Sequence, residues 1–220
     1  MTHHHLTYRR TLSGKLSLLI LTLFSLTLSQ FALAQASAKV VLIKNQVTVE
    51  SSSKAVSPVS RGADIQVGDI IRTGKDARAI IRFNDGSVFT LGADTEMKIT
   101  AFSSTEQQKK GAFEFVKGAF RIVTGAITKT ESPDFTVHTP MGSIGVRGTD
   151  FWGGNLSDDN SVDVVLLESE HTLEIKNPYG TVILKEPKQG TTLVSGKAPL
   201  SARIWPEEKL QRAFKTVATE

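Results

Sequence analysis

Short apolar runs separated by turn-forming residues fill most of the chain from Lys39 onward. Polar residues punctuate these runs, a pattern that is typical of many short strands. The runs cover residues 40–43, 47–50, 65–71, 79–83, 88–91, 97–100, 162–167, 172–175, 182–184 and 191–194. The predicted fold class is therefore all-β, with many short strands in a two-layer sandwich or a solenoid-like β-roll.

A first hairpin is predicted over residues 78–91. A three-residue loop, Asn84–Gly86, places Ile81 opposite Phe89, with Gly86 in the left-handed conformation. A two-residue Asp-Gly turn would instead place Arg82 opposite Phe89. Hydrophobic matching across the strands favours the longer loop.

A second hairpin is predicted around Gly118. A turn at this glycine would pair Phe115 with Phe120 and Glu114 with Arg121 on neighbouring strands. Aromatic contact and charge pairing then agree on one register.

Residues 134–154 change the parity of their alternation twice. Pro140 predicts a corner, and the later change predicts a bulge at Gly148, since glycine tolerates that backbone geometry. Such a bulge would place Arg147 and Asp150 on one face. If the site is buried, we expect Arg147 to pair with Asp150 or with backbone carbonyls.

Helical periodicity appears only near the C-terminal end. Pro206 suits a first helical position, and Leu210, Phe214 and Val217 recur at helical spacing. The pattern predicts a short amphipathic helix over residues 207–217 that covers one edge or end of the sheets.

The N-terminal residues 1–34 have the pattern of a cleaved signal peptide with a helical apolar segment. Basic residues precede the apolar run 16–28, and Ala32-Leu33-Ala34 follows as a peptidase site. Cleavage after Ala36, a twin-arginine leader and an uncleaved signal anchor are the alternatives. The prediction is export to the periplasm, with residues 35–220 as a single domain that does not span the membrane.

Charge and cysteine content narrow the function classes. Three of the 26 Lys and Arg lie before Gln35 and none of the 22 Asp and Glu does, which leaves 23 bases, 22 acids and a net charge of +1. This balance gives no basic face for nucleic acid. The chain has no cysteine, so we expect no disulfide framework and no thiolate chemistry.

Candidate catalytic and metal-binding residues are sparse after the leader. His138 and His171 lack neighbours at metal-ligand spacing, and the acidic run at 158–163 lacks the glycine and glutamate of a calcium loop. Ser143 lies between two glycines at the wrong spacing for a nucleophile elbow. We therefore expect no catalytic residue, no metal and no cofactor, although His138 or His171 beside a serine and a carboxylate would indicate a hydrolase.

Two tryptophans carry the main alternative. Trp152 and Trp205 could form a stacking platform for sugars, which would make the chain a cell-wall or polysaccharide-binding module, with peptidoglycan among its candidate ligands. Packing in the core or at an edge is the more ordinary use of a tryptophan flanked by strand residues.

Five short motifs in order resemble the FecR domain family of bacterial envelope proteins. They are Gly68-Asp-Ile-Ile-Arg-Thr-Gly74, Asp85-Gly-Ser87, Gly118 before an alternating strand, Thr139-Pro140 and Val146-Arg-Gly-Thr-Asp-Phe151, and the resemblance covers residues 61–205. The motif positions are Gly68, Asp69, Thr73, Gly74, Asp85, Gly86, Ser87, Gly118, Thr139, Pro140, Gly145, Arg147, Gly148, Thr149 and Phe151.

The resemblance implies a non-enzymatic extracytoplasmic domain that senses signals or binds another envelope protein. The family is best known in sensors that relay an outer-membrane signal to a cytoplasmic sigma factor. Here only about fifteen residues precede the apolar segment, too few for a folded cytoplasmic domain, so we do not expect direct sigma-factor regulation. The resemblance implies a scaffold role for the motif positions and assigns no partner-binding residue.

Overall fold

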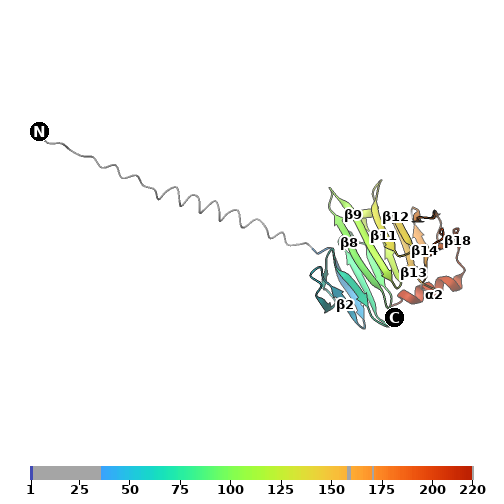
Figure 1. The fold of residues 1–220 in the computed structure, drawn as a ribbon, viewed down its shortest axis with the longest axis horizontal. Coiled ribbons are helices and arrows are strands. Elements are labelled where there is room, and N and C mark those ends of the chain that lie inside the picture. Colours follow the sequence, from blue (N-terminus) through green and yellow to red (C-terminus); the bar gives the residue numbers. More distant parts are fainter. Residues whose placement is uncertain (2–35, 158–159, 170, 220) are drawn as a thin grey trace. The chain divides into compact units, whose positions relative to one another are not determined.

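Two sheets, stacked face to face, make up most of residues 36–219 (Figure 1). The computed structural model describes residues 1, 36–157, 160–169 and 171–219. The predicted signal peptide therefore lies, apart from Met1, outside the described residues, as do Asp158 and Asp159. Within the described part, no helix has the length and apolar character needed to cross a membrane.

Sheet A contains nine strands in the described part of the chain. In spatial order they are β18 (Arg203–Ile204), β17 (Gln189–Val194), β14 (Ser161–Ser169), β13 (Thr149–Gly154), β10 (Phe120–Val123), β7 (Val88–Leu91), β6 (Arg78–Phe83), β1 (Ala38–Lys44) and β4 (Asp64–Ile65).

Sheet B also contains nine strands among the described residues. In spatial order they are β16 (Gly180–Leu184), β15 (Leu173–Asn177), β12 (Gly142–Val146), β11 (Asp134–Thr139), β9 (Lys109–Lys117), β8 (Glu96–Ser104), β5 (Ile70–Thr73), β2 (Val47–Glu50) and β3 (Val56–Pro58).

Along the chain, the strands alternate between the two sheets, singly or in pairs, and the later strands lie progressively farther toward one end of the sandwich. Strands that neighbour each other pair antiparallel, except for the parallel pair of β9 and β11. The all-β, two-layer prediction is confirmed, and the steady advance resembles that of a solenoid.

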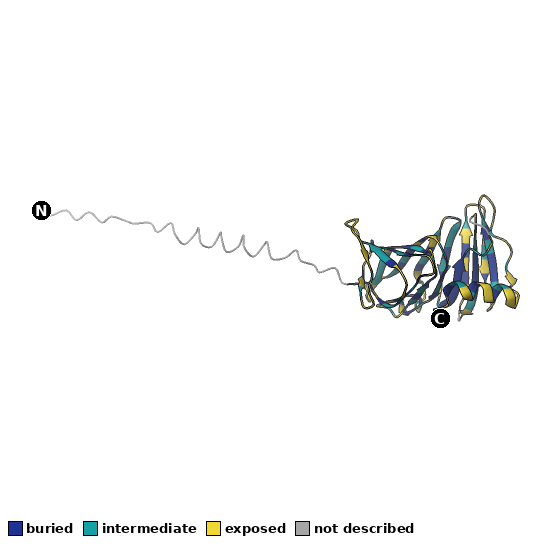
Figure 2. Cartoon of the chain, turned by 90° about the horizontal axis from the view of Figure 1, so that it is seen from below, coloured by how far each residue is buried: buried dark blue, intermediate teal, exposed yellow. Residues whose placement is uncertain are grey.

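The main core lies between the sheets. Alternate side chains of both sheets point inward, and a cluster of phenylalanines fills the centre. Phe89 of sheet A and Phe113 of sheet B have ring centroids 4.6 Å apart. In Figure 2 the buried residues follow the strands, and exposed residues alternate with half-buried ones along the helix.

A second apolar cluster lies on the outer face of sheet A, under α2 (Glu207–Val217). The predicted amphipathic helix is confirmed with the predicted bounds, but its predicted place is wrong, because it covers part of a sheet face and not an edge or end of the sheets. It packs on Trp152 and Val165 with Leu210 and Ala213, and all six residues of β13 are buried because that strand faces the core on one side and the helix on the other.

The two predicted hairpins have different outcomes. The register of Ile81 opposite Phe89 is confirmed, and Gly86 has φ +88°. The prediction of a hairpin around Gly118 is wrong, because β9 belongs to sheet B and β10 belongs to sheet A, so the two strands do not pair. The rings of Phe115 and Phe120 do stack, with centroids 3.8 Å apart, but they meet between the sheets.

The stretch 134–154 also crosses between layers. The predicted corner at Pro140 is the two-residue turn between β11 and β12. The predicted bulge is wrong, because Arg147 and Gly148 form the bend that connects β12 in sheet B with β13 in sheet A. Gly148 has φ +57°, a left-handed conformation that glycine adopts without steric cost.

Candidate functional site

Several loops meet at one end of the sandwich, around the β11–β12 turn, and we call this end the loop end. They are the connections that follow β9, β11, β13, β15 and β17. The turn Thr139–Gly142 separates two hollows, one polar and one apolar. Loops at a sandwich end are where this architecture commonly places recognition surfaces.

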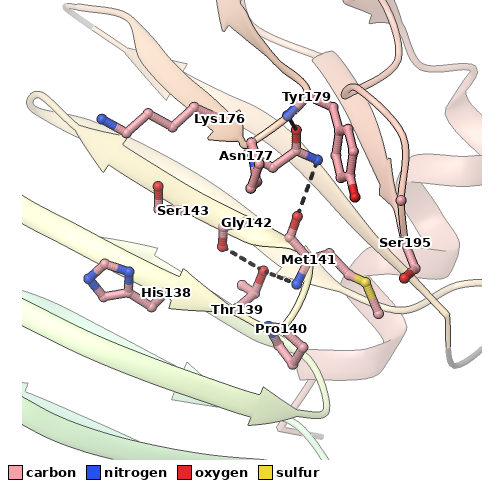
Figure 3. A pocket seen from close by; sticks show the side chains of 12 residues that line it. His138, Thr139, Pro140, Met141, Gly142, Ser143, Lys176, Asn177, Tyr179 and Ser195 are labelled. Atoms are coloured by element: carbon pink, nitrogen blue, oxygen red, sulfur yellow. Dashed lines mark hydrogen bonds between the residues drawn. The ribbon is translucent and has the colours of Figure 1, made fainter.

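The turn itself is held by side-chain hydrogen bonds (Figure 3). The Thr139 hydroxyl donates to the carbonyl of Gly142 at 2.8 Å and accepts from the Met141 amide at 3.3 Å. The Asn177 amide donates to the carbonyls of Met141 at 3.4 Å and Lys197 at 2.8 Å. These bonds connect three neighbouring loops and fix the wall of the polar hollow.

The polar hollow is open and has a volume of about 600 Å³. Its lining includes His138, Ser143, Lys176 and Tyr179, which come from β11, β12, β15 and the β15–β16 turn. The Tyr179 side chain is largely exposed at the rim. The hollow therefore offers a cation, a phenol and an imidazole to solvent.

The outer face of sheet B aligns residue types that are found in hydrolases. The strand registers place Glu114, His138 and Ser143 in one cross-strand row. No hydrogen bond joins these three side chains in the described structure, and the row lies on an open face. The geometry that the hydrolase hypothesis requires is absent from this row.

The second histidine is far along the chain from this row. His171 lies near Gly148, where a Cβ built on the glycine would come 3.2 Å from the imidazole Cδ2. Among the residues that the structure describes, no group of three His, Asp or Glu side chains could hold a metal ion.

The apolar hollow has a volume of about 370 Å³ and is more enclosed. Phe115, Phe120, Met141 and Val162 line it, together with Lys117 at the end of β9. Val116, also in the lining, has 44% of its surface exposed. An apolar pocket beside a polar rim suits the anchor side chain of a protein partner.

The Asp85-Gly-Ser87 motif fastens a neighbouring loop. The Asp85 carboxylate accepts from the Ser87 amide at 2.9 Å and from the Ser87 hydroxyl at 2.8 Å. The Ser87 hydroxyl accepts from the Gly125 amide at 2.8 Å, and the Ile127 amide donates to Asp85 at 3.3 Å. The motif thus positions the segment that contains the short 3-10 helix η2 (Ala126–Thr128).

Thr73 and Gly118 belong to a second network. The Thr73 hydroxyl donates to the Gly92 carbonyl at 2.6 Å and accepts from the Thr95 amide at 2.9 Å. The Thr95 hydroxyl bonds to the backbone of Ala119. Gly118 has φ +91°, and a Cβ there would come 2.2 Å from the Thr95 hydroxyl oxygen.

The remaining motif positions lie in the core or in bends. Phe151 is fully buried, and Asp69 accepts from the Gln66 amide at 2.9 Å within the bend that Gly68 opens. The Thr124 hydroxyl donates to the Thr149 carbonyl at 3.1 Å and accepts from the Thr149 amide at 2.9 Å. Gly74 donates its amide to the Gln46 carbonyl, whereas at Gly145 a Cβ would meet nothing nearer than 3.8 Å.

Arg147 is exposed, so the condition for its predicted pairing is not met. Asp150 is 8% exposed and pairs with Arg121, whose Nε and Nη2 lie 2.9 and 2.5 Å from its two carboxylate oxygens. These hydrogen bonds raise the pKa of Arg121 above its ordinary value. Bonds to Glu96 and Glu50 likewise raise the pKa of Arg72 on sheet B.

The tryptophan platform is not present. Trp152 is 0% exposed and Trp205 is 6% exposed, with ring centroids 6.1 Å apart in an edge-to-face contact. The Trp152 indole donates to the Thr216 hydroxyl at 2.9 Å, and Lys209 lies 4.0 Å from the Trp205 ring centroid. Both rings pack between α2 and sheet A, so neither ring face is available to stack on a sugar.

The fold and the loop end define the chain as an all-β sandwich module. Residues 69–170 match the family model described as FecR protein, so this part of the chain is similar to that family. The resemblance seen in the motifs is confirmed over this range. A search of curated proteins gave no match.

Two solved structures share the fold. They are crystal structures of a putative anti-sigma factor from Parabacteroides distasonis ATCC 8503, at 1.65 and 2.50 Å resolution. In each comparison the identity is 19%, the TM-score is 0.52 and the match covers 64% of this chain. The chain spans 62% of the length of those proteins.

Sequence reasoning missed most residues of the loop end. Lys117, Met141, Lys176 and Tyr179 come from four separate segments, and no local pattern connects them. The turn Asn177–Gly180 was a usable signal, because it places Tyr179 at an exposed tip. Its position beside the β11–β12 turn depends on the order of strands in sheet B.

Proposed function

We propose that this chain is a non-enzymatic periplasmic signalling module that binds another envelope protein through the loop end described above. The FecR match and the fold shared with the Parabacteroides structures support a role in signalling. Periplasmic residence rests on the signal-peptide pattern in the sequence. The peptidoglycan alternative has no observation in its favour once both tryptophans are buried.

The single observation that carries the proposal is the apolar hollow between the β9–β10 and β11–β12 connections. It combines an enclosed apolar lining with an exposed valine, Val116, and a lysine at its rim. An apolar pocket with a few polar groups at its rim is the first candidate for a binding site in such a structure. The motif positions, in this proposal, shape the scaffold and do not contact the partner.

The test is site-specific photocrosslinking in living cells. A photoreactive phenylalanine analogue replaces Val116, and the matched control replaces Val67, which is 43% exposed on the connection between β4 and β5. We expect one discrete envelope-protein adduct from position 116, found in the periplasmic fraction, and none from position 67.

A second variant makes the result specific. Met141→Asp places a charge in the apolar lining and should abolish the adduct from position 116 while the circular dichroism spectrum stays unchanged. The proposal fails if positions 116 and 67 give the same adducts, or if Met141→Asp leaves the adduct intact. Residence in the cytoplasmic fraction would refute the periplasmic part.

A further inference from the structure

The two sheets have four edge strands, and three of them are protected. The edges β4 and β18 are two residues long and contain Asp64 and Arg203, and β3 is three residues long and ends at Pro58. Short length, charge and proline are the usual means by which proteins block edge-to-edge pairing. The fourth edge, β16, has five residues, Gly-Thr-Val-Ile-Leu, and none of these features.

The backbone groups of two β16 residues point away from the sheet. β15 and β16 are joined by a two-residue turn, with Asn177 opposite Gly180. In such a hairpin the hydrogen-bonded pairs alternate, so Val182 and Leu184 bond to β15 while Thr181 and Ile183 present their amides and carbonyls outward. Within the described residues, no backbone partner lies on that side of Thr181 or Ile183.

The end of the edge is defined as well. The Gln189 side-chain oxygen accepts from the amides of Lys185 at 2.8 Å and Glu186 at 3.2 Å. The chain therefore stops presenting an edge directly after Leu184. The unpaired edge is limited to β16, and Ile183 in its middle has 42% of its surface exposed.

We propose that two copies of this chain pair antiparallel through β16, with a two-fold axis at Val182. In this register Thr181 of one copy lies opposite Ile183 of the second copy, and each such pair exchanges both of its N–H···O=C bonds. The outward N–H and C=O groups of the strand thereby form hydrogen bonds with the same groups of the second copy. The β16 edge can therefore pair with itself.

The side chains fit the same register. On the core side, Val182 meets its own copy at the axis, and Leu184 lies opposite Gly180 of the second copy, so a large residue faces a small one. On the outer side, Ile183 lies opposite Thr181, and the strand carries no charge that would repel its copy. Glu174 and Lys176 on β15 place opposite charges at the two ends of each outer row.

The absence of cysteine from the sequence gives a direct test. Val182 and its copy would form a non-hydrogen-bonded pair with Cα atoms about 4.5 Å apart, within the range of a disulfide. We expect the purified Val182→Cys chain to oxidise quantitatively to a covalent dimer. The matched control is Val56→Cys on β3, the opposite edge of sheet B, which should stay monomeric.

A second experiment measures association without a crosslink. Sedimentation of the wild-type chain at concentrations on the order of 100 μM should show a dimer. Thr181→Pro, which removes one outward amide, and Ile183→Lys, which adds like charges at the pair, should each weaken the dimer about tenfold or more, whereas Val56→Lys should not.

The two experiments decide the proposal together. It is overturned if the wild-type chain is monomeric at this concentration and Val182→Cys crosslinks no faster than Val56→Cys. It is also overturned if a dimer forms but tolerates both Thr181→Pro and Ile183→Lys. The pairing does not depend on the partner at the loop end, because it concerns the purified chain alone.

Discussion

The Asp163 carboxylate, 1% exposed on β14, accepts a 2.7 Å ion-pair bond from the Lys209 ammonium on α2. The same carboxylate accepts from the Thr192 hydroxyl at 2.6 Å and from the Leu156 amide at 3.3 Å. Lys209 also lies over the Trp205 ring. This pair fixes the helix over the second apolar cluster, where it covers part of the outer face of sheet A.

Lys209→Met should destabilise the domain by about 3 kcal/mol, because it leaves a buried carboxylate without its cation. The matched control is Lys215→Met, an exposed lysine in the last turn of the same helix, which should change stability by less than about 0.5 kcal/mol. Urea unfolding measures both. Equal free energies of unfolding for the two variants would show that the ion pair does not hold the helix.

Arg121→Met should also destabilise, by about 3 kcal/mol at neutral pH, because Asp150 is then buried without its guanidinium. In the wild type the raised pKa of Arg121 keeps its contribution constant until strongly alkaline pH. Equal free energies of unfolding for the variant and the wild type at neutral pH would contradict this account.

Ser87→Ala should cost about 1–3 kcal/mol, because it leaves the Gly125 amide without its acceptor in a buried site. Ser60→Ala, an exposed serine outside this network, serves as the control and should be neutral within about 0.5 kcal/mol. Amide exchange at Gly125 gives a local readout. Unchanged protection of Gly125 in Ser87→Ala would rule out the fastening role of the motif.

Gly148→Val should destabilise by about 2 kcal/mol, because a β-branched residue resists a φ of +57°. Gly148→Asn should cost clearly less, since asparagine tolerates the left-handed conformation. Gly145→Ala, where the new Cβ meets only ordinary contacts, is the control. Thermal melting should rank the three in this order, and a Gly148→Val melting temperature equal to that of wild type would refute the conformational argument.

Structural features that depend on residues close together in the sequence could be predicted from the sequence. The register of Ile81 opposite Phe89 and the helix Glu207–Val217 depend on a loop length and a local period, and both are confirmed. The order of five short motifs was enough to indicate the FecR family. The loop end was not predictable, because Lys117, Met141 and Tyr179 meet only after the strands are ordered.

The sequence by itself determined the all-β class, most of the strand positions and the C-terminal helix, because alternation and helical period are properties of adjacent residues. The predicted run 65–71 is not one strand, since its two ends belong to β4 and β5 in different sheets. Only the tertiary structure decided which sheet each strand joins. Phe115 and Phe120 were expected to touch and do so, but across the core, because alternation marks a buried face without saying whether its neighbour lies beside it or opposite it. For the same reason Asp150 pairs with Arg121 from an adjacent strand instead of Arg147, whose side chain follows the bend out to solvent.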